Sequence, residues 1–500
     1  MGIIIILPHN NNIMMEFTKE QEYIIQKFEK GENLFISGPG GTGKTELIKH
    51  IQSRGYKGLQ TCALTGCAAL LLKCGARTIH SWSGIKRANG PIRDIVYSVM
   101  HSSYSKSQWK KTKILIIDEV SMMSQKIFEL LDAIGKTVKQ VDKPFGGIQV
   151  IFVGDFYQLP PVGSLDDETT SKFCFESKLW NKTFQKENQI QLSHIFRQND
   201  PLYKSILMEI RSGNISNKSI EILNSKVSDT LVHDCTKIYP KRKDVERVNQ
   251  DYYNTLDKTQ SYTYSTKVSY DNDTYVENNT PINSYMLKQY QKYTHIQKEI
   301  ETNILLNSVP IEHMIHLRRG TRVMCCVNFD MEKGICNGSQ GIVLDFQETD
   351  GKYYPIVKYD NGVVETMFQY TWQSESCPTI CIQQVPLMWA WAITIHKIQG
   401  ATLDCAQIDI GKRVFESGQT YVALSRIKSL EGLHITSFDP TTIFANKKVI
   451  DYYNQLLDIQ FDTHKDVSEN NKTVKKNTKV IMQDTSNNSK ITQFFNVKKI

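Results

Sequence analysis

The feature that most constrains the fold of this chain is the sequence GPGGTGKT at residues 38–45, which has the form of a phosphate-binding loop. The apolar run before it, at 33–37, predicts a short buried strand, and a predicted helix follows as far as about Gln52. In such a strand–turn–helix unit the backbone N–H groups and the helix N-terminus face phosphate oxygens. We expect Lys44 to reach the β- and γ-phosphates and Thr45 to ligate magnesium. The predicted nucleotide-binding residues of the loop are Gly38, Pro39, Gly40, Gly41, Thr42, Gly43, Lys44 and Thr45.

A second apolar run, at 114–117, ends in the two carboxylates Asp118 and Glu119. Such a run suits a central parallel strand covered on both faces, and ligands bind at the carboxyl ends of these strands. We therefore expect Asp118 to hold magnesium and Glu119 to polarise the attacking water, although the pair could instead cap the next helix. A third predicted strand, at 149–153, leads to Gln158, which is placed to orient water or to sense the γ-phosphate.

A remote arginine, Arg426, follows the segment at 421–425. We predict that it reaches the γ-phosphate from a second domain, so that nucleotide opens and closes a cleft between two domains, as in a molecular motor. The alternative is a surface salt-bridge residue, because exposed ion pairs are common and weak.

These motifs, in this order, resemble those of the PIF-type (petite integration frequency) DNA helicases, a branch of superfamily one related to RecD. The resemblance covers about residues 16 to 440. The matching segments are FTKEQ at 17–21, TGCAA at 65–69, TIHSWSGI at 78–85, KPFGGIQ at 143–149, GDFYQLPPV at 154–162, FRQ at 196–198, TIHKIQGAT at 394–402 and YVALSR at 421–426. The chain departs from the family pattern at Cys67 and Trp82, where other apolar residues are expected.

The resemblance implies an α/β fold of two RecA-like motor domains with parallel sheets. It also implies a small insertion in the first domain and an SH3-like β-barrel that contacts DNA in the second. Strand-like runs at 341–346, 354–359 and 363–367, separated by Asp-Gly and Asn-Gly turns, independently predict β hairpins. The predicted boundaries are 1–13 (leader), 14–187 (first motor domain, with a small element at about 86–110), 188–317 (second motor domain, first part, with a variable and partly helical insertion at about 255–310), 318–385 (SH3-like domain), 386–461 (second motor domain, remainder) and 462–500 (disordered basic tail).

Residue roles also follow from the resemblance. Gln21 is implied to recognise adenine, Arg197 to act as the first arginine finger, and Gln399 and Gly400 to line the nucleotide site. A protein that walks along a strand must hold its backbone with hydroxyls, N–H groups and basic side chains, aided by aromatic faces. The predicted DNA-binding residues are Thr65, Gly66, Thr78, His80, Thr394, His396 and Lys397, and Trp82 either stacks on a base or packs in the core.

The function implied is that of an ATP-dependent DNA helicase, moving 5′ to 3′ on single strands in replication, repair or recombination, telomere maintenance included. Its implied cofactors are ATP and Mg²⁺, its implied partners are single-stranded and forked DNA, and the protein is expected to be monomeric in solution. The alternative is a DNA-stimulated ATPase that binds or remodels nucleic acid without processive unwinding. A net charge of +8 suits a nucleic-acid partner without proving one.

The 11 cysteines are scattered along the chain. Cys325, Cys326 and Cys336, and separately Cys377 with Cys381, hint at a metal site, but no repeated C-x-x-C pair completes one. We therefore expect reduced core thiols in an intracellular protein, located in the nucleus or a viral replication compartment. The apolar run at 3–7 is too short to span a membrane.

The polar, lysine-rich tail ends with a short apolar cluster. The segment NSKITQFF at 488–495 resembles a clamp-binding peptide, in which one helical turn would present Ile491, Phe494 and Phe495 to the groove of a sliding clamp. The alternative is that the tail folds back on the protein's own surface.

Overall fold

The computed structural model describes residues 17–456, apart from 73, 86–87, 89, 165, 229–234, 270–290, 292, 310, 328, 331, 336, 375–376 and 378. The predicted leader, the predicted clamp-binding peptide and Cys336 lie outside the described residues.

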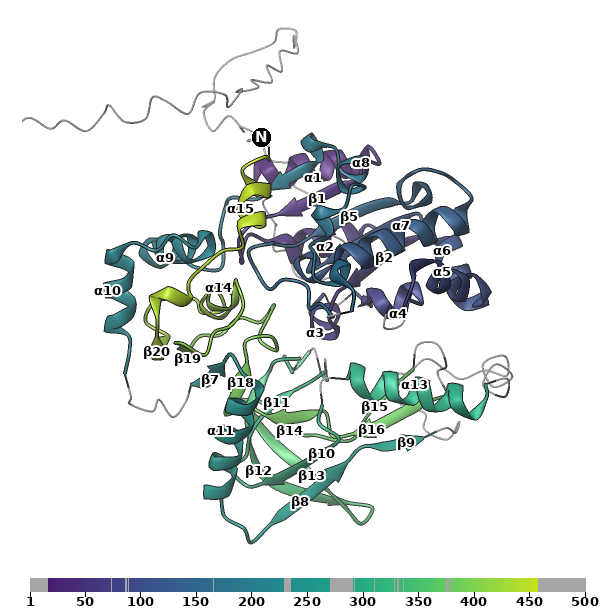
Figure 1. Cartoon of the computed structure of the whole chain (residues 1–500). Helices are drawn as coiled ribbons and strands as arrows, with labels where there is room; N and C mark the ends of the chain where they lie inside the picture. Colours follow the sequence, from purple (N-terminus) through teal and green to yellow (C-terminus); the bar gives the residue numbers. More distant parts are fainter. Residues whose placement is uncertain are drawn as a thin grey trace, which may run out of the picture. The chain divides into compact units, whose positions relative to one another are not determined.

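The first motor domain is built on a sheet flanked by helices (Figure 1). The sheet has six strands in the order β3-β2-β4-β5-β1-β6. All of its strand pairs are parallel, and the central strands are almost wholly buried, as their apolar runs predicted. The strands are β1 (Leu34–Ser37), β2 (Leu59–Ala63), β3 (Arg77–Thr78), β4 (Ile114–Asp118), β5 (Gln149–Val153) and β6 (Gln189–Gln191). The helices are α1 (Lys19–Glu29), α2 (Lys44–Ser53), α3 (Gly66–Leu71), α4 (Ile79–Ser83), α7 (Gln125–Lys139) and α8 (Trp180–Thr183).

The small element inserted in this domain consists of two helices, α5 (Ile92–His101) and α6 (Ser103–Lys111). It is attached through an aromatic contact, since the rings of Trp82 and Trp109 lie 4.7 Å apart and both side chains are fully buried. Trp82 therefore packs in the core, and of the two roles considered for it, stacking on a nucleic-acid base is not available.

The second motor domain has a four-stranded parallel sheet in the order β18-β7-β19-β20. This sheet and the first one confirm the predicted pair of parallel α/β motor domains. The strands are β7 (Thr236–Tyr239), β18 (Ala392–Thr394), β19 (Ala406–Ile410) and β20 (Leu433–Phe438), and the helices are α9 (Pro201–Ser212), α10 (Asn217–Ser225), α11 (Arg242–Thr255) and α14 (Gln419–Leu424).

The last described helix, α15 (Lys447–Tyr453), lies beside β1 rather than on the second sheet (Figure 1, yellow). Val449 belongs to the hydrophobic core of the first motor domain, and Tyr452 and Tyr453 pack against that core. The sequence boundary at 386–461 had placed this helix in the second motor domain, so the chain returns to the first domain earlier than its composition indicates.

Antiparallel strands make up the domain inserted in the second motor domain. A five-stranded sheet has the order β14-β13-β12-β11-β17, and smaller sheets pair β10 with β8 and β15-β16-β9. The strands are β8 (Ser261–Ser265), β9 (Lys267–Ser269), β10 (Met314–Arg318), β11 (Arg322–Cys325), β12 (Gln340–Thr349), β13 (Lys352–Tyr359), β14 (Val364–Thr366), β15 (Tyr370–Gln373), β16 (Cys381–Gln384) and β17 (Leu387–Trp389), and the helix is α13 (His295–Ser308).

The predicted hairpins of this domain are confirmed. β12 pairs with β13 and β13 with β14, and the connecting turns place Asp350, Gly351 and Gly362 at positive φ angles. The segment predicted as a variable and partly helical insertion at 255–310 contains the helix α13, and it also supplies β8 and β9 to these sheets. The sequence did not predict these two strands, because each is short, pairs with one neighbouring strand only and lies in a segment with weak periodicity of apolar residues.

Two further features concern the cysteines and the membrane. Cys235 and Cys405 form a disulfide, so the prediction that the thiols are all reduced is wrong for this pair. They meet because they immediately precede β7 and β19, which are neighbouring parallel strands. Across the described ranges, no helix has both the length and the apolar character that crossing a bilayer requires.

Candidate functional site

The phosphate-binding loop connects β1 to α2, as predicted, and its backbone geometry requires glycine. Gly38 has a φ angle of +142°, and a Cβ added there would lie 2.6 Å from the carbonyl oxygen of Leu192. Gly41 has a φ angle of +86°, and its Cβ would lie 2.5 Å from the Cβ of Arg197. The loop is thus folded tightly against the segment that follows β6.

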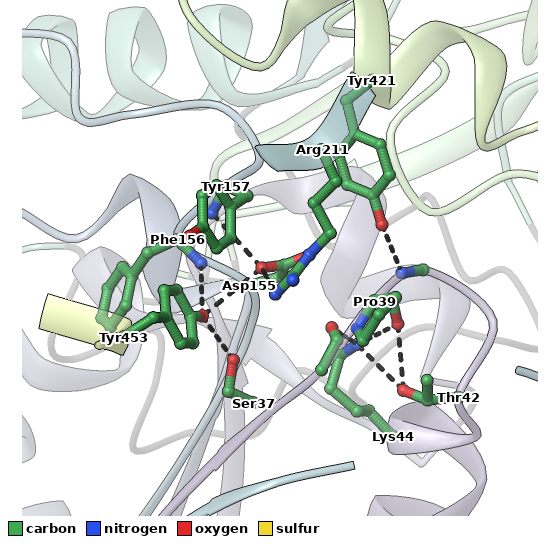
Figure 2. A network of polar contacts seen from close by, with 12 residues as sticks. Ser37, Pro39, Thr42, Lys44, Asp155, Phe156, Tyr157, Arg211, Tyr421 and Tyr453 are labelled. Carbon is green, nitrogen blue, oxygen red and sulfur yellow. Dashed lines mark hydrogen bonds and ion pairs between the residues drawn. The ribbon is translucent and has the colours of Figure 1, made fainter. Parts of the chain in front are cut away.

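The Lys44 amine lies inside this loop. Its Nζ atom donates hydrogen bonds to the carbonyl oxygens of Gly38 (2.6 Å) and Pro39 (2.8 Å) (Figure 2). Burial lowers the pKa of Lys44 to about 8, although the negative charges of Asp155, Glu119 and Asp118 act in the opposite direction. The amine is therefore positioned where phosphate oxygens would replace the loop's own carbonyl groups as its partners.

The two predicted acids stand at the carboxyl end of β4, close to the loop. Burial, with a smaller contribution from the charge of Glu119, raises the pKa of Asp118 to about 7. The Asp118 carboxylate and the hydroxyl of Thr45, the second residue of α2, are oxygen ligands of the kind Mg²⁺ prefers. Glu119 accepts a 3.0 Å hydrogen bond from Nε2 of Gln399, which is a residue of the second motor domain.

Gln158 follows the carboxyl end of β5, and Gln21 contacts the phosphate loop. The Gln158 side chain is buried, and its Oε1 atom has no hydrogen-bond partner among the described residues. A buried acceptor of this kind fits a site that receives a hydrogen-bond donor, such as a water molecule. Gln21 forms a capping box with Thr18, the N-cap residue of α1. Its Nε2 atom donates a 3.4 Å hydrogen bond to the carbonyl oxygen of Thr42, so Gln21 contacts the loop itself.

The two predicted arginine fingers both reach the loop. A Cβ at Gly40 would lie 3.4 Å from Nη2 of Arg426 and 3.5 Å from Nη1 of Arg197. Both are anchored to α14 and the residue after it, because Arg197 donates to the carbonyl oxygen of Ser425 and Arg426 donates to that of Val422, each at 3.0 Å. Burial, and then the nearby charge of Arg426, lower the pKa of Arg197 to about 9. Two cations held this close together attract an anion.

Two aromatic residues of the site were not singled out from the sequence. The backbone N–H of Gly40 donates a 2.9 Å hydrogen bond to the hydroxyl of Tyr421 (Figure 2). Phe196 is about half exposed, and its ring lies 3.7 Å from a Cβ built at Gly43. Both residues stand inside segments that resemble the family, but an aromatic ring carries no charge, so the sequence gives no sign that it contacts the loop.

The predicted DNA-binding residues lie at carboxyl ends of strands in both sheets. Thr65 follows β2 and caps α3, Thr78 ends β3 and caps α4, and Thr394 ends β18. His396 and Lys397 are exposed in the turn after β18. His80 lies within α4 and Gly66 begins α3. Each motor domain therefore contributes hydroxyl-bearing turns that a phosphate backbone can contact.

The fold and this site define a P-loop nucleoside-triphosphate-binding protein with two RecA-like domains. The profile of the PIF1-like helicase family matches residues 16–221, and that of the 2B domain of DNA helicase Pif1 matches residues 300–346. The crystal structure of a double mutant of the Pif1 helicase from Bacteroides is 30% identical, with a TM-score of 0.67, and the alignment covers 88% of this chain and 97% of that one. The chain belongs to the PIF1-like helicase family.

Other relatives agree with this membership. The Pif1 helicase from Candida albicans has a TM-score of 0.71 at 29% identity, with 89% of this chain and 100% of that chain covered. The ATP-dependent DNA helicase PIF1 of Xenopus laevis is 34% identical over 88% of this chain and 65% of its own length, and that of Danio rerio is 32% identical over 91% and 65%. The chain thus spans just under two thirds of the length of these curated relatives.

Proposed function

We propose that this protein is an ATP-dependent DNA helicase that translocates 5′ to 3′ on single-stranded DNA and unwinds duplexes. The observation that carries the proposal is the meeting of Arg197, Arg426 and Tyr421 with Gly40 in the phosphate loop. Residues of the second motor domain thereby touch the loop of the first, so a nucleotide bound there would contact both. Relatives named as ATP-dependent DNA helicases, and solved Pif1 structures with ADP-AlF4 and with single-stranded DNA, support the proposal.

Within this function the site residues have distinct roles. Lys44 and the loop N–H groups bind the phosphates, and Thr45 and Asp118 hold Mg²⁺, which when bound would neutralise phosphate charge. Glu119 orients the attacking water and Gln158 positions it. Arg197 and Arg426 bind the oxygens on which charge develops. Gln21 and the exposed ring of Phe196 flank the place next to the loop where an adenine base fits.

We further propose that Thr65, Gly66, Thr78, His80, Thr394, His396 and Lys397 hold the backbone of the strand. Two sets of contacts, one from each sheet, allow one domain to keep its grip while the other shifts. The enzyme would be a monomer in solution and would act in the nucleus or in a viral replication compartment.

The decisive experiment compares forked substrates that carry a single-stranded 5′ tail or 3′ tail. We expect ATP-dependent strand separation from the 5′ tail only. Strand separation from the 3′ tail alone would overturn the polarity. DNA-stimulated ATP hydrolysis without separation of either substrate would establish instead the alternative of a binding or remodelling ATPase.

The catalytic assignments are tested with single substitutions. Lys44→Ala should abolish ATP turnover, and Glu119→Gln should bind ATP while hydrolysing it poorly. Lys49→Ala is the matched control, because it also removes an α2 lysine, one that pairs with Glu46 at 2.7 Å outside the loop. Normal DNA-stimulated turnover by either site variant would contradict the assigned roles.

The tail supports a separate proposal, that Ile491, Phe494 and Phe495 bind a sliding clamp. The sequence alone carries it, since these residues lie outside the described structure. Deleting residues 491–500 should spare unwinding and remove clamp binding in a pull-down with purified clamp. Unchanged clamp capture would discard the idea, and so would an equal loss after replacing the tail's lysines alone, since that would indicate a charge effect only.

A further inference from the structure

A buried ion pair joins the two motor domains next to the phosphate loop (Figure 2). Arg211 donates from Nε to Oδ2 of Asp155 at 2.9 Å and from Nη2 to Oδ1 at 2.8 Å, and both side chains are at least 95% buried. Asp155 follows β5 of the first sheet. Arg211 lies in α9, whose apolar residues pack in the core of the second domain. The pair is therefore a bidentate, water-excluded link between domains.

Two tyrosine rings cover the guanidinium group. The rings of Tyr157 and Tyr453 stack at 4.8 Å with an interplanar angle of 13°. The Arg211 carbon Cζ lies 4.3 Å from the Tyr157 ring centroid and 5.3 Å from that of Tyr453. Cations placed over aromatic faces in a desolvated site are held strongly. One of these rings comes from α15, about 300 residues along the chain from the other.

The hydroxyl of Tyr453 contacts both strand ends that frame the loop. It accepts a hydrogen bond from the backbone N–H of Phe156 at 3.2 Å, lies 3.4 Å from Oδ1 of Asp155, and makes a short hydrogen bond with Oγ of Ser37. Ser37 is the last residue of β1 and directly precedes Gly38 of the loop. One hydroxyl thus ties the entrance of the phosphate loop to the end of β5.

From there a hydrogen-bonded turn leads to Gln158. The carboxylate of Asp155 accepts a hydrogen bond from the backbone N–H of Tyr157 at 3.3 Å. The backbone carbonyl oxygen of Asp155 accepts one from the backbone N–H of Gln158 at 2.8 Å. Because Asp155 organises this turn, whatever fixes Asp155 also fixes the backbone that carries the Gln158 side chain.

We propose that Tyr453 is a positioning residue for ATP hydrolysis: its hydroxyl holds Asp155 on Arg211 and thereby fixes the turn that carries Gln158. This inference rests on the proposed function. It extends the site to a helix beyond the recognised motifs, one that belongs by sequence to the end of the second motor domain. Tyr453 touches neither nucleotide nor DNA in this role, so it acts only through the residues that it orients.

The test compares Tyr453→Phe with Tyr452→Phe in the full chain. The neighbouring Tyr452 is a matched control, because its hydroxyl donates to Oε1 of Gln189 at 2.7 Å, away from the turn, while its ring packs against the same core. We expect Tyr453→Phe to lower the DNA-stimulated kcat roughly tenfold, the rate equivalent of one misplaced catalytic hydrogen bond, with KM for ATP nearly unchanged. Tyr452→Phe should retain the wild-type kcat. Arg211→Lys, which keeps the charge and loses the bidentate geometry, should resemble Tyr453→Phe.

The thermal midpoint and the fraction of molecules that bind a fluorescent ATP analogue are measured for each variant. A merely structural role would lower both in parallel with kcat, and that outcome would overturn the proposal. Equal kcat values for the two phenylalanine variants would overturn it as well. A wild-type protein without ATP turnover would instead refute the proposed function, so the two failures are distinguishable.

Discussion

The backbone N–H of Gly40 donates to the hydroxyl of Tyr421 across 381 positions of the sequence. This hydrogen bond occupies one of the loop donors that a phosphate would use. The second motor domain therefore competes with nucleotide for the loop as well as supplying arginines to it.

The first prediction follows from that competition. Tyr421→Phe should tighten ATP binding in the absence of DNA by about threefold to tenfold, because a net hydrogen bond worth about 1 kcal/mol no longer has to be broken. Fluorescence titration with a labelled ATP analogue measures the Kd. Tyr203→Phe is the control, since its hydroxyl donates to the carbonyl oxygen of Leu424 and not to the loop. Weaker binding by Tyr421→Phe would show that the hydroxyl assists the bound state.

The second prediction concerns pH. Burial lowers the pKa of Lys44 to about 8, so its amine loses its proton above that pH in the nucleotide-free protein. Phosphates bind the protonated amine more tightly, so ATP binding takes up a proton and weakens as the pH rises from about 8 to about 9.5. Isothermal titration calorimetry in buffers of different ionisation enthalpy measures this uptake. Lys44→Arg should bind with little pH dependence over the same range, and a flat wild-type profile would contradict the assignment.

The third prediction concerns the buried ion pair. Arg211→Met should lower the free energy of unfolding by about 3–5 kcal/mol, because it leaves the fully buried carboxylate of Asp155 without its partner. Adding Asp155→Leu should recover part of this loss. Urea unfolding of the two single variants and the double variant measures the coupling energy. Additive effects would mean that the two side chains do not interact in solution.

The fourth prediction concerns the disulfide between Cys235 and Cys405, which closes a loop of 170 residues. Its reduction should lower the free energy of unfolding by about 2–4 kcal/mol, since the unfolded chain regains conformational freedom. Thermal melts with and without a phosphine reductant measure the change. Cys405→Ser should melt like the reduced protein and should not respond to the reductant. A wild-type melt unaffected by reductant, with all thiols titrating, would show that the bond is absent in solution.

Local patterns predicted much of the architecture. The apolar runs before Gly38 and Asp118 became β1 and β4, and the Asp-Gly and Asn-Gly turns became hairpin connections. These features depend on a few consecutive residues, because the identities of those residues determine local burial and turn type. The meeting of Arg426 with the loop was predicted as well, although only from motif order.

Contacts between distant segments were less accessible. Nothing in the residues around Tyr453 indicates that α15 returns to the first motor domain, since a short amphipathic helix can cover either sheet. The pairing of β9 with β16 and the union of Cys235 with Cys405 likewise depend on which strands become neighbours. Such pairings are decided by global packing, and local periodicity does not encode them.

The hydrogen bond from Gln399 to Glu119 has a consequence for ATP hydrolysis in the absence of DNA. While the Glu119 carboxylate accepts a hydrogen bond from the Gln399 amide, it is less able to orient an attacking water molecule. Gln399 sits only five positions beyond Thr394, in the turn proposed to grip DNA, so a strand that pulls on this turn would also withdraw the amide. In that case the protein would hydrolyse ATP slowly in the absence of DNA and faster once DNA binds, because the Gln399 side chain would restrain Glu119 until then.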